Sequence, residues 1–225
     1  MIQIAIDGPG GAGKSTVSKR IAEKLGIVYV DTGALYRTVG YYVRSAGVDP
    51  HDREGVGALL GDISIEVKYV DGAQKVFLNG EDLGDRIRTP EMSMYASAVS
   101  AIPSVRAFLL DTQKDIAKKN SVIMDGRDIG TVILPDADVK IYLTATAECR
   151  ARRRYDELVA KGQSVSYDDV LREMNERDTQ DSTREIAPTA AAEDAVFFDN
   201  TGMDLEQTVS YIIRVVKEKT DFLAE

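Results

Sequence analysis

A glycine-rich segment near the start of the chain limits the possible fold more than any other feature. Residues 8–16 read G-P-G-G-A-G-K-S-T, which fits the phosphate-binding pattern G-x-x-x-x-G-K-[ST] at every fixed position. Residues 2–7 form a short apolar run typical of a buried parallel strand, and residues 14–25 carry apolar side chains at helical spacing. The motif therefore lies between a strand and a helix, as a P-loop must.

The residue types in this segment suit the binding of a polyphosphate. Its glycines, at positions 8, 10, 11 and 13, permit positive φ angles that turn backbone N–H groups inward around an anion. Lys14 would reach the β- and γ-phosphates, and the Ser15 hydroxyl would bind the Mg²⁺ that bridges them. A glycine turn that only joins a strand to a helix needs neither residue. The expected nucleotide-binding residues are Gly8, Pro9, Gly10, Gly11, Ala12, Gly13, Lys14, Ser15 and Thr16.

Composition restricts the class of protein. A chain of 225 residues that is 44% hydrophobic predicts one sizeable core with inserted subdomains. The formal net charge of −9 argues against a nucleic-acid-binding surface. The single cysteine excludes an internal disulfide, no apolar run reaches the roughly 20 residues that span a bilayer, and no signal peptide precedes the first strand. We therefore expect a cytoplasmic monomer without nucleic-acid or membrane partners.

Polar residues follow the second and third predicted core strands. Residues 27–30 form a short apolar strand followed by D-T-G-A-L-Y-R at 31–37, where Asp31 or Thr32 can cap a helix that carries Arg37. A capped helix with a solvated arginine would give the same pattern. The strand at 121–124 ends in D-G-R-D. Asp125 is placed like a Walker-B acid, which holds Mg²⁺ through water, although an Asp-Gly turn with surface charges is the alternative.

The remaining segments complete an α/β pattern with two excursions. Alternating apolar residues between about 48 and 90, with an Asn79-Gly80 turn, predict a small antiparallel sheet that either covers a site or is decorative. Helices are expected at 91–101 and 104–118. In the second of these, Arg106 occupies the first turn, an unfavourable place for a cation unless an anion or polar ligand meets it.

The last third of the chain has a strand at 139–143, a polar arginine-rich region, and a strand and helix that close the fold. Between residues 155 and 188, Arg177, Asp181 and Arg184 follow i, i+4, i+7 spacing and share one helical face if the helix persists that far. A solvated face of salt bridges is the alternative. Because this segment has few large apolar residues, we expect ligand phosphates to be the main groups that hold it down.

These parts suit phosphoryl transfer. Its transition state requires neutralisation of dispersed negative charge, which a P-loop, Mg²⁺ and several arginines supply without a strong general base. The only histidine, His51, lies in a polar turn, and an acceptor that is itself a phosphate is already a nucleophile.

Taken together, the motifs resemble those of the bacterial cytidylate kinases, which belong to the nucleoside monophosphate kinase superfamily. The resemblance runs essentially end to end and includes P-S-V-R from Pro103 and R-D-T-Q-D-S-T-R from Arg177. It implies a P-loop NTPase-type α/β fold: a five-stranded parallel sheet with helices on both faces, a monophosphate-binding insertion with a small antiparallel sheet, and a helical lid. The expected single domain, 1–225, divides into a core of 1–31, 104–154 and 189–225, an insertion of 32–103, and a lid of 155–188.

The resemblance also implies that ATP, with Mg²⁺, gives its γ-phosphate to CMP or dCMP. Arg37 and Arg127 would hold the acceptor phosphate, and Ser97, Arg106 and Asp128 would read the cytosine edge. Thr32 stands where the family often has serine and keeps the hydroxyl. The expected catalytic residues are Lys14, Arg127, Arg177 and Arg184; the expected metal-binding residues are Ser15 and, through water, Asp125; and the expected substrate-binding residues are Asp31, Thr32, Arg37, Ser97, Arg106, Arg127, Asp128, Arg177, Asp181 and Arg184.

Two alternatives remain from the sequence. One is another small-molecule P-loop kinase that acts on UMP, AMP or shikimate, although adenylate-type chains resemble D-G-F-P-R where this chain has D-G-R-D. The other is a GTP-dependent switch, which predicts an N-K-x-D guanine motif that the sequence lacks.

Overall fold

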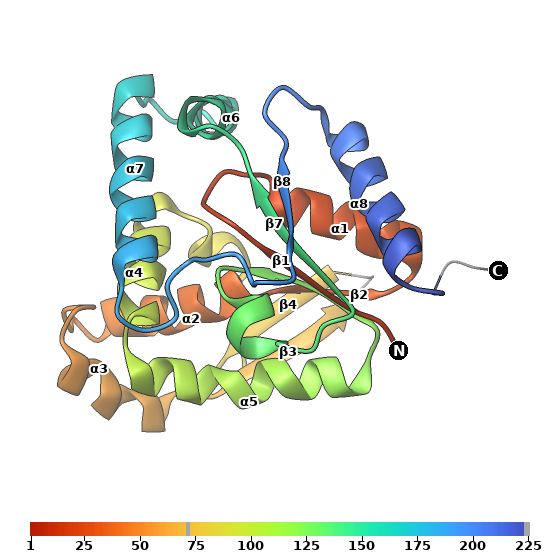
Figure 1. The fold of residues 1–225 in the computed structure, drawn as a ribbon. Coiled ribbons are helices and arrows are strands. Elements are labelled where there is room, and N and C mark those ends of the chain that lie inside the picture. Colours follow the sequence, from red (N-terminus) through yellow and green to blue (C-terminus); the bar gives the residue numbers. More distant parts are fainter. Residues whose placement is uncertain (71–72, 223–225) are drawn as a thin grey trace.

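A parallel sheet of five strands forms the centre of the molecule (Figure 1). The computed structural model describes residues 1–70 and 73–222. All four strand pairings in the sheet are parallel, in the order β2-β6-β1-β7-β8, which confirms the predicted sheet. The strands are β1 (Gln3–Asp7), β2 (Val28–Asp31), β6 (Val122–Gly126), β7 (Val139–Thr144) and β8 (Val196–Asp199).

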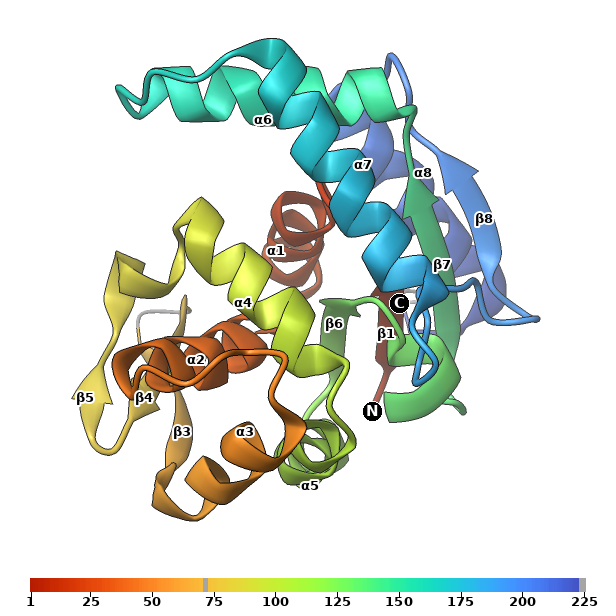
Figure 2. The same ribbon diagram turned by 90° about the vertical axis from the view of Figure 1, so that its left-hand side faces the viewer.

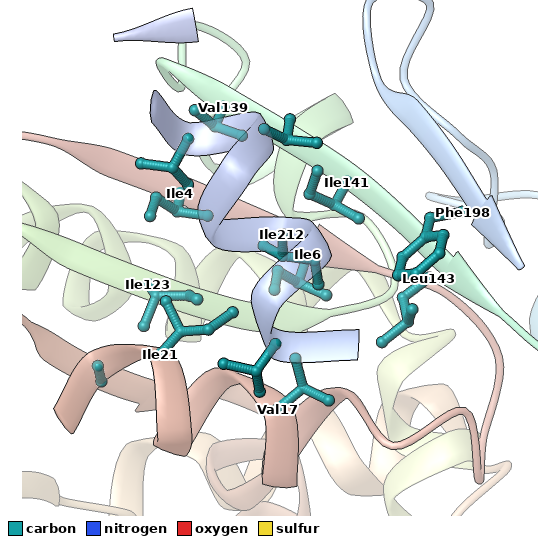
Figure 3. Close-up of a cluster of buried hydrophobic side chains, with 14 of the residues drawn as sticks. Ile4, Ile6, Val17, Ile21, Ile123, Val139, Ile141, Leu143, Phe198 and Ile212 are labelled. Carbon is teal, nitrogen blue, oxygen red and sulfur yellow. The ribbon is translucent and has the colours of Figure 1, made fainter. Parts of the chain in front are cut away.

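Helices cover both faces of this sheet. Alternate residues of each strand point to opposite faces, so the two faces pack against different helices. Ile4 and Ile6 pack with α1 (Lys14–Leu25) and α8 (Leu205–Lys219) in one buried cluster (Figure 3). Ala5 faces the other side, where α5 (Pro103–Lys119) and a short helix at Ile129–Ile133 complete a second cluster. With both faces buried, the strands read as nearly continuous apolar runs.

The helix boundaries around the P-loop follow local capping signals. Helix α1 ends at Gly26, whose left-handed φ of 64° directs its N–H to the carbonyl of Ala22. Asp31 caps α2 (Thr32–Ser45) by accepting a hydrogen bond from the N–H of Ala34. These two boundaries fix where the polar segment after β2 enters the site.

The insertion holds the predicted antiparallel sheet and its own core. Its sheet has the order β3-β4-β5, and Asn79 and Gly80, both at positive φ, form the turn between the last two strands. Among the described residues, no single helix is long and apolar enough to cross a membrane, and α4 and α5 reach that length only as a pair bent by 101°. The elements are α3 (Arg53–Leu59), two short 3₁₀ helices (Leu60–Asp62 and Gly84–Ile87), β3 (Ile65–Val70), β4 (Ala73–Leu78), β5 (Glu81–Asp82) and α4 (Pro90–Ser100).

Two helices, α6 (Ala147–Ala160) and α7 (Tyr167–Thr183), form the arginine-rich region. Figure 2 shows α6 across the top of the view and α7 descending diagonally below it. Helix α7 also contacts α4. Helix α7 ends at Thr183, and Arg184 has an extended backbone with ψ of 143°. The shared helical face depended on the helix persisting to Arg184, and this condition is not met, because the chain leaves the helix one residue earlier.

The close approach of α2 and α4 gives a stability prediction. A Cβ on Gly40, in α2, would lie 2.9 Å from the Cβ of Tyr95 and 3.3 Å from the backbone nitrogen of Ala96. We expect Gly40→Ala to lower the free energy of unfolding by about 1–2 kcal/mol in urea titrations, because overpacking outweighs the gain in helix propensity. Gly57→Ala is the matched control, since its Cβ would meet only the Ser104 hydroxyl at 3.6 Å. Equal stabilities of the two variants would contradict this account.

Candidate active site

A cavity of about 650 Å³ opens at the carboxyl ends of β1, β6 and β2. These strands are neighbours and parallel, so the polar segments that follow them meet at one edge of the sheet. The cavity brings together Lys14, Ser15, Asp125 and all the predicted substrate-binding residues. Of the predicted nucleotide-binding residues, Gly8, Pro9 and Ala12 do not line this cavity.

The P-loop is shaped by glycines that no other residue replaces without strain. Gly8, Gly11 and Gly13 have φ values of 143°, 74° and 90°. A Cβ on Gly8 would lie 2.0 Å from the carbonyl oxygen of Leu143, so the loop passes directly over the end of β7. Gly10 does not have a positive φ, so the prediction of positive φ is wrong at that position.

The side chain of Lys14 contacts the backbone of the P-loop itself. Its Nζ donates hydrogen bonds of 2.8 Å to the carbonyl oxygens of both Gly8 and Pro9. Burial, and next the positive charge of Arg127, lower the pKa of Lys14. A phosphate oxygen that enters the loop would therefore meet an ammonium group already held in position.

Asp125 holds the centre of the site, at the end of β6. Its Oδ2 accepts a hydrogen bond of 2.8 Å from the Ser15 hydroxyl, and its Oδ1 accepts one of 2.8 Å from the hydroxyl of Tyr29. Burial, and then the negative charge of Asp31 on the adjacent strand, raise the pKa of Asp125. The described residues contain no cluster of three or more His, Cys, Asp or Glu able to hold a metal. A hydroxyl beside a carboxylate nevertheless fits Mg²⁺, because this ion needs few protein ligands. It retains several bound waters and takes further ligands from substrate phosphates.

Two arginines meet the carboxylate of Asp31, beyond β2. Arg37 Nη2 donates a hydrogen bond of 2.8 Å to Oδ2, and Arg88 Nη1 lies 3.7 Å from the same oxygen. Burial raises the pKa of Asp31, but these two guanidinium groups outweigh it and bring the pKa below its usual value. Thr32 donates its hydroxyl proton to the Asp125 carbonyl oxygen at 2.8 Å. In the described part of the chain, the Nε atom of Arg37 has no hydrogen-bond partner and remains available to an anion.

Arg106, in the first turn of α5, has an acidic partner. It forms an ion pair with Asp128, and its guanidinium lies 5.7 Å from the ring centre of Tyr36. Burial raises the pKa of Asp128, and the charge of Arg106 opposes that rise. Both side chains are thus oriented toward the cavity before any ligand arrives.

Asp181, near the end of α7, connects the arginine-rich region to the rest of the site. It accepts hydrogen bonds from the Ser97 hydroxyl at 2.7 Å and from Arg127 Nε at 3.0 Å. Arg177 and Arg184 lie 3.8 and 3.9 Å from its oxygens. Protein side chains therefore also attach this region to the rest of the site. From the sequence, we expected ligand phosphates to be the main groups that do so.

Several residues of the site had no role in the sequence analysis. Arg184 Nη1 donates to the hydroxyl of Ser100 at 2.9 Å, one turn beyond Ser97 on α4, and this i, i+3 spacing was an available signal. Asp7 accepts hydrogen bonds from the backbone N–H groups of Ile129 at 2.7 Å and Gly130 at 2.8 Å. Its place immediately before the P-loop was also an available signal. No local pattern distinguishes Arg88 or Tyr29.

Comparison with known proteins gives one consistent result. A family model described as cytidylate kinase matches residues 4–218. A cytidylate kinase of Caldicellulosiruptor bescii is 51% identical over 95% of each chain, and one of Carboxydothermus hydrogenoformans is 47% identical over 99% of this chain and 100% of its own. A solved structure of an uncharacterized protein from Eubacterium ventriosum has a TM-score of 0.55 at 14% identity and covers 96% of this chain and 98% of its own. That structural likeness shows the fold alone.

The environment of Asp7 predicts a pH dependence of stability. Burial, opposed by the two N–H donors, raises the pKa of Asp7 from 3.8 to about 6. The folded protein therefore binds this proton more tightly than the unfolded chain, so the stability that Asp7 contributes is present below pH 4 and is lost as the pH rises to about 6. Relative to Asp7→Asn, the wild-type free energy of unfolding should fall by up to about 3 kcal/mol between about pH 4 and pH 7.

Urea titrations across this pH range measure that difference. Asp156→Asn, at an exposed position on α6, is the control whose difference from the wild type should not change in the same way. A pH-independent difference for Asp7→Asn would mean that the two N–H groups keep the carboxylate ionised despite its burial.

Proposed function

Since the chain belongs to the cytidylate kinase family, we propose that it transfers the γ-phosphate of ATP to CMP or dCMP, giving CDP or dCDP and ADP. The observation that carries this proposal is a single cavity that joins a P-loop to a buried, paired Asp128 and Arg106. The first group of residues suits a triphosphate donor, and the second suits a base with both donors and acceptors. Arginines line the same cavity and would surround a phosphoryl group in transfer.

The donor side would use the P-loop backbone, Lys14 and Ser15. Lys14 would exchange its hydrogen bonds to the loop carbonyls for the β- and γ-phosphate oxygens. Ser15 would bind Mg²⁺ directly, and Asp125 would hold one of its waters. Held by these residues, Mg²⁺ would neutralise part of the negative charge of the triphosphate.

Transfer would depend on arginines that surround the moving group. Arg127, Arg177 and Arg184 now share the carboxylate of Asp181, and phosphate oxygens would replace part of that negative charge. Such fixed guanidinium groups stabilise charge that spreads over the equatorial oxygens. The acceptor phosphate is its own nucleophile, so no side chain has to remove a proton.

The acceptor side would recognise both the phosphate and the base. Arg37, oriented by Asp31, and Arg127 would bind the monophosphate, with the Thr32 hydroxyl beside them. Asp128 would accept a hydrogen bond from the cytosine amino group, where uracil has a carbonyl oxygen that a carboxylate repels. Ser97 and Arg106 would hold the remaining base edge.

We also propose the domain division, the partners and the cellular location that the sequence predicts. The core would comprise 1–31, 104–154 and 189–225, the monophosphate-binding insertion 32–103, and the lid 155–188. Residue 155 lies within α6, so the hinge on that side would lie at an end of the helix. The partners would be the small nucleotides CMP, dCMP and ATP, without nucleic acid or membrane, in a cytoplasmic monomer of net charge −9.

A coupled assay of ADP production tests the proposal directly. With Mg-ATP as donor, CMP and dCMP should be turned over with the highest kcat/KM among CMP, dCMP, UMP, AMP and shikimate. Preference for AMP or shikimate would point to another small-molecule kinase. If none of these acceptors were turned over, the proposed reaction would be wrong.

Base recognition by Asp128 gives a specificity prediction. We expect Asp128→Asn to reduce the CMP to UMP ratio of kcat/KM by about tenfold or more, because the amide can donate to the uracil carbonyl. The KM for ATP should stay within about threefold, because Asp128 pairs with Arg106 and would meet the base rather than the triphosphate. Asp136→Asn, at an exposed position close by in the chain, is the control. An unchanged ratio with a raised KM for ATP would contradict the assignment.

Arg184 gives a prediction for transfer and lid closure. Arg184→Ala should lower kcat by about a hundredfold or more while changing ATP affinity much less, because it removes a cation from the transferring group. Arg172→Ala, at an exposed position on α7, should leave kcat near the wild-type value. In the wild-type protein, amides of α7 should gain protection from hydrogen exchange when CMP and a non-hydrolysable ATP analogue are bound. Equal protection with and without ligands would show that the segment is rigid.

A further inference from the structure

Tyr29 is a buried tyrosine of β2 to which the reaction above assigns no role. It is paired with Ile123 in the sheet, so Asp125, two residues further along β6, points to the same face. The ring packs in the core cluster beneath α1, and only 8% of the residue is exposed. Its hydroxyl donates a hydrogen bond of 2.8 Å to Oδ1 of Asp125, a residue that lines the cavity.

This hydrogen bond determines which oxygen of Asp125 faces the P-loop. The terminal torsion of an aspartate is broad, so an unrestrained carboxylate samples many orientations. Here Oδ1 is held by Tyr29 from β2, which leaves Oδ2 for the Ser15 hydroxyl at 2.8 Å. Because Ser15 uses its proton toward Oδ2, the lone pairs of its oxygen stay free for a cation. Hydroxyl and carboxylate are therefore arranged before Mg-ATP binds.

We propose that Tyr29 is a positioning residue for Mg²⁺, acting through Asp125. The inference rests on the proposed function, in which Ser15 and Asp125 receive the Mg²⁺ that accompanies ATP. Groups that orient a metal-binding side chain commonly affect metal affinity by about tenfold or more. A purely structural tyrosine, whose hydroxyl only finds a buried acceptor, would affect folding stability and leave Mg²⁺ affinity unchanged.

Binding measurements with Tyr29→Phe separate these roles. We expect the Mg²⁺ concentration that half-saturates the binding of a fluorescent, non-hydrolysable ATP analogue to rise about three- to tenfold. Binding of the same analogue in EDTA should be unchanged, which also shows that the variant is folded. Tyr211→Phe is the matched control, since Tyr211 packs against the same cluster from α8, and it should match the wild type in both titrations. Superimposable Mg²⁺ titrations of Tyr29→Phe and wild type would overturn the proposal.

A double-mutant cycle with Asp125→Ala tests the route of the effect. If Tyr29 acts through Asp125, Tyr29→Phe should cause no further change in Mg²⁺ dependence once the carboxylate is absent. An effect of equal size in the Asp125→Ala background would also overturn the proposal. These titrations use no acceptor nucleotide, so they stand even if CMP proves not to be the substrate, and failure of the two proposals can be told apart.

Discussion

The parallel pairing of β1 with β6 is the interaction on which the site depends. In this register Ile6 lies beside Asp125 and Asp7 beside Gly126, so both strands end at the same level. The P-loop leaves one strand at Gly8, and Arg127 leaves the other. Asp7 strengthens this junction by accepting N–H groups from the segment that follows Asp128. The donor and acceptor halves of the cavity thus begin from adjacent residues of one rigid sheet.

Buried charge is arranged in pairs throughout the cavity. Arg37 meets Asp31, Arg106 meets Asp128, and Arg127 meets Asp181. Buried ion pairs add little net stability, because the cost of desolvating both charges offsets most of their attraction. Their value is that each carboxylate holds a guanidinium in a fixed direction, so that little reorganisation remains when a phosphate enters. Within the described chain, the Nε atoms of Arg37 and Arg177 have no hydrogen-bond partner, and such a phosphate would accept hydrogen bonds from them.

The region of α6 and α7 is held by few contacts compared with the core. Its apolar cluster has only Ala151, Leu158 and Val170 as fully buried members. Polar contacts at the far end of α7, through Asp181 and Arg184, attach it to α4. Because those contacts involve the same arginines that are proposed to bind phosphates, substrate binding and the position of this region would be linked by competition for the same groups.

The sequence alone determined the elements and the type of chemistry. The strand, P-loop and helix of residues 2–25, the Asp31 cap and the Asn79-Gly80 turn follow from local patterns, because helix and strand periodicity and capping depend on neighbouring residues. Resemblance of motifs added the substrate and the residues expected to bind it. Local patterns gave a wrong positive φ at Gly10 and left the end of α7 open, which the structure places at Thr183.

Only the tertiary structure decided how distant residues combine. Tyr29 and Asp125 are 96 positions apart, and Asp7 and Ile129 are 122 apart, so no local spacing relates them. Arg106 illustrates both levels. Its position in the first turn of α5 indicated that an anion or a polar ligand meets it, but only the fold shows that Asp128 is its ion-pair partner. Contacts of this kind depend on which strands become neighbours, and that choice is made by burial of the whole core rather than by any one segment.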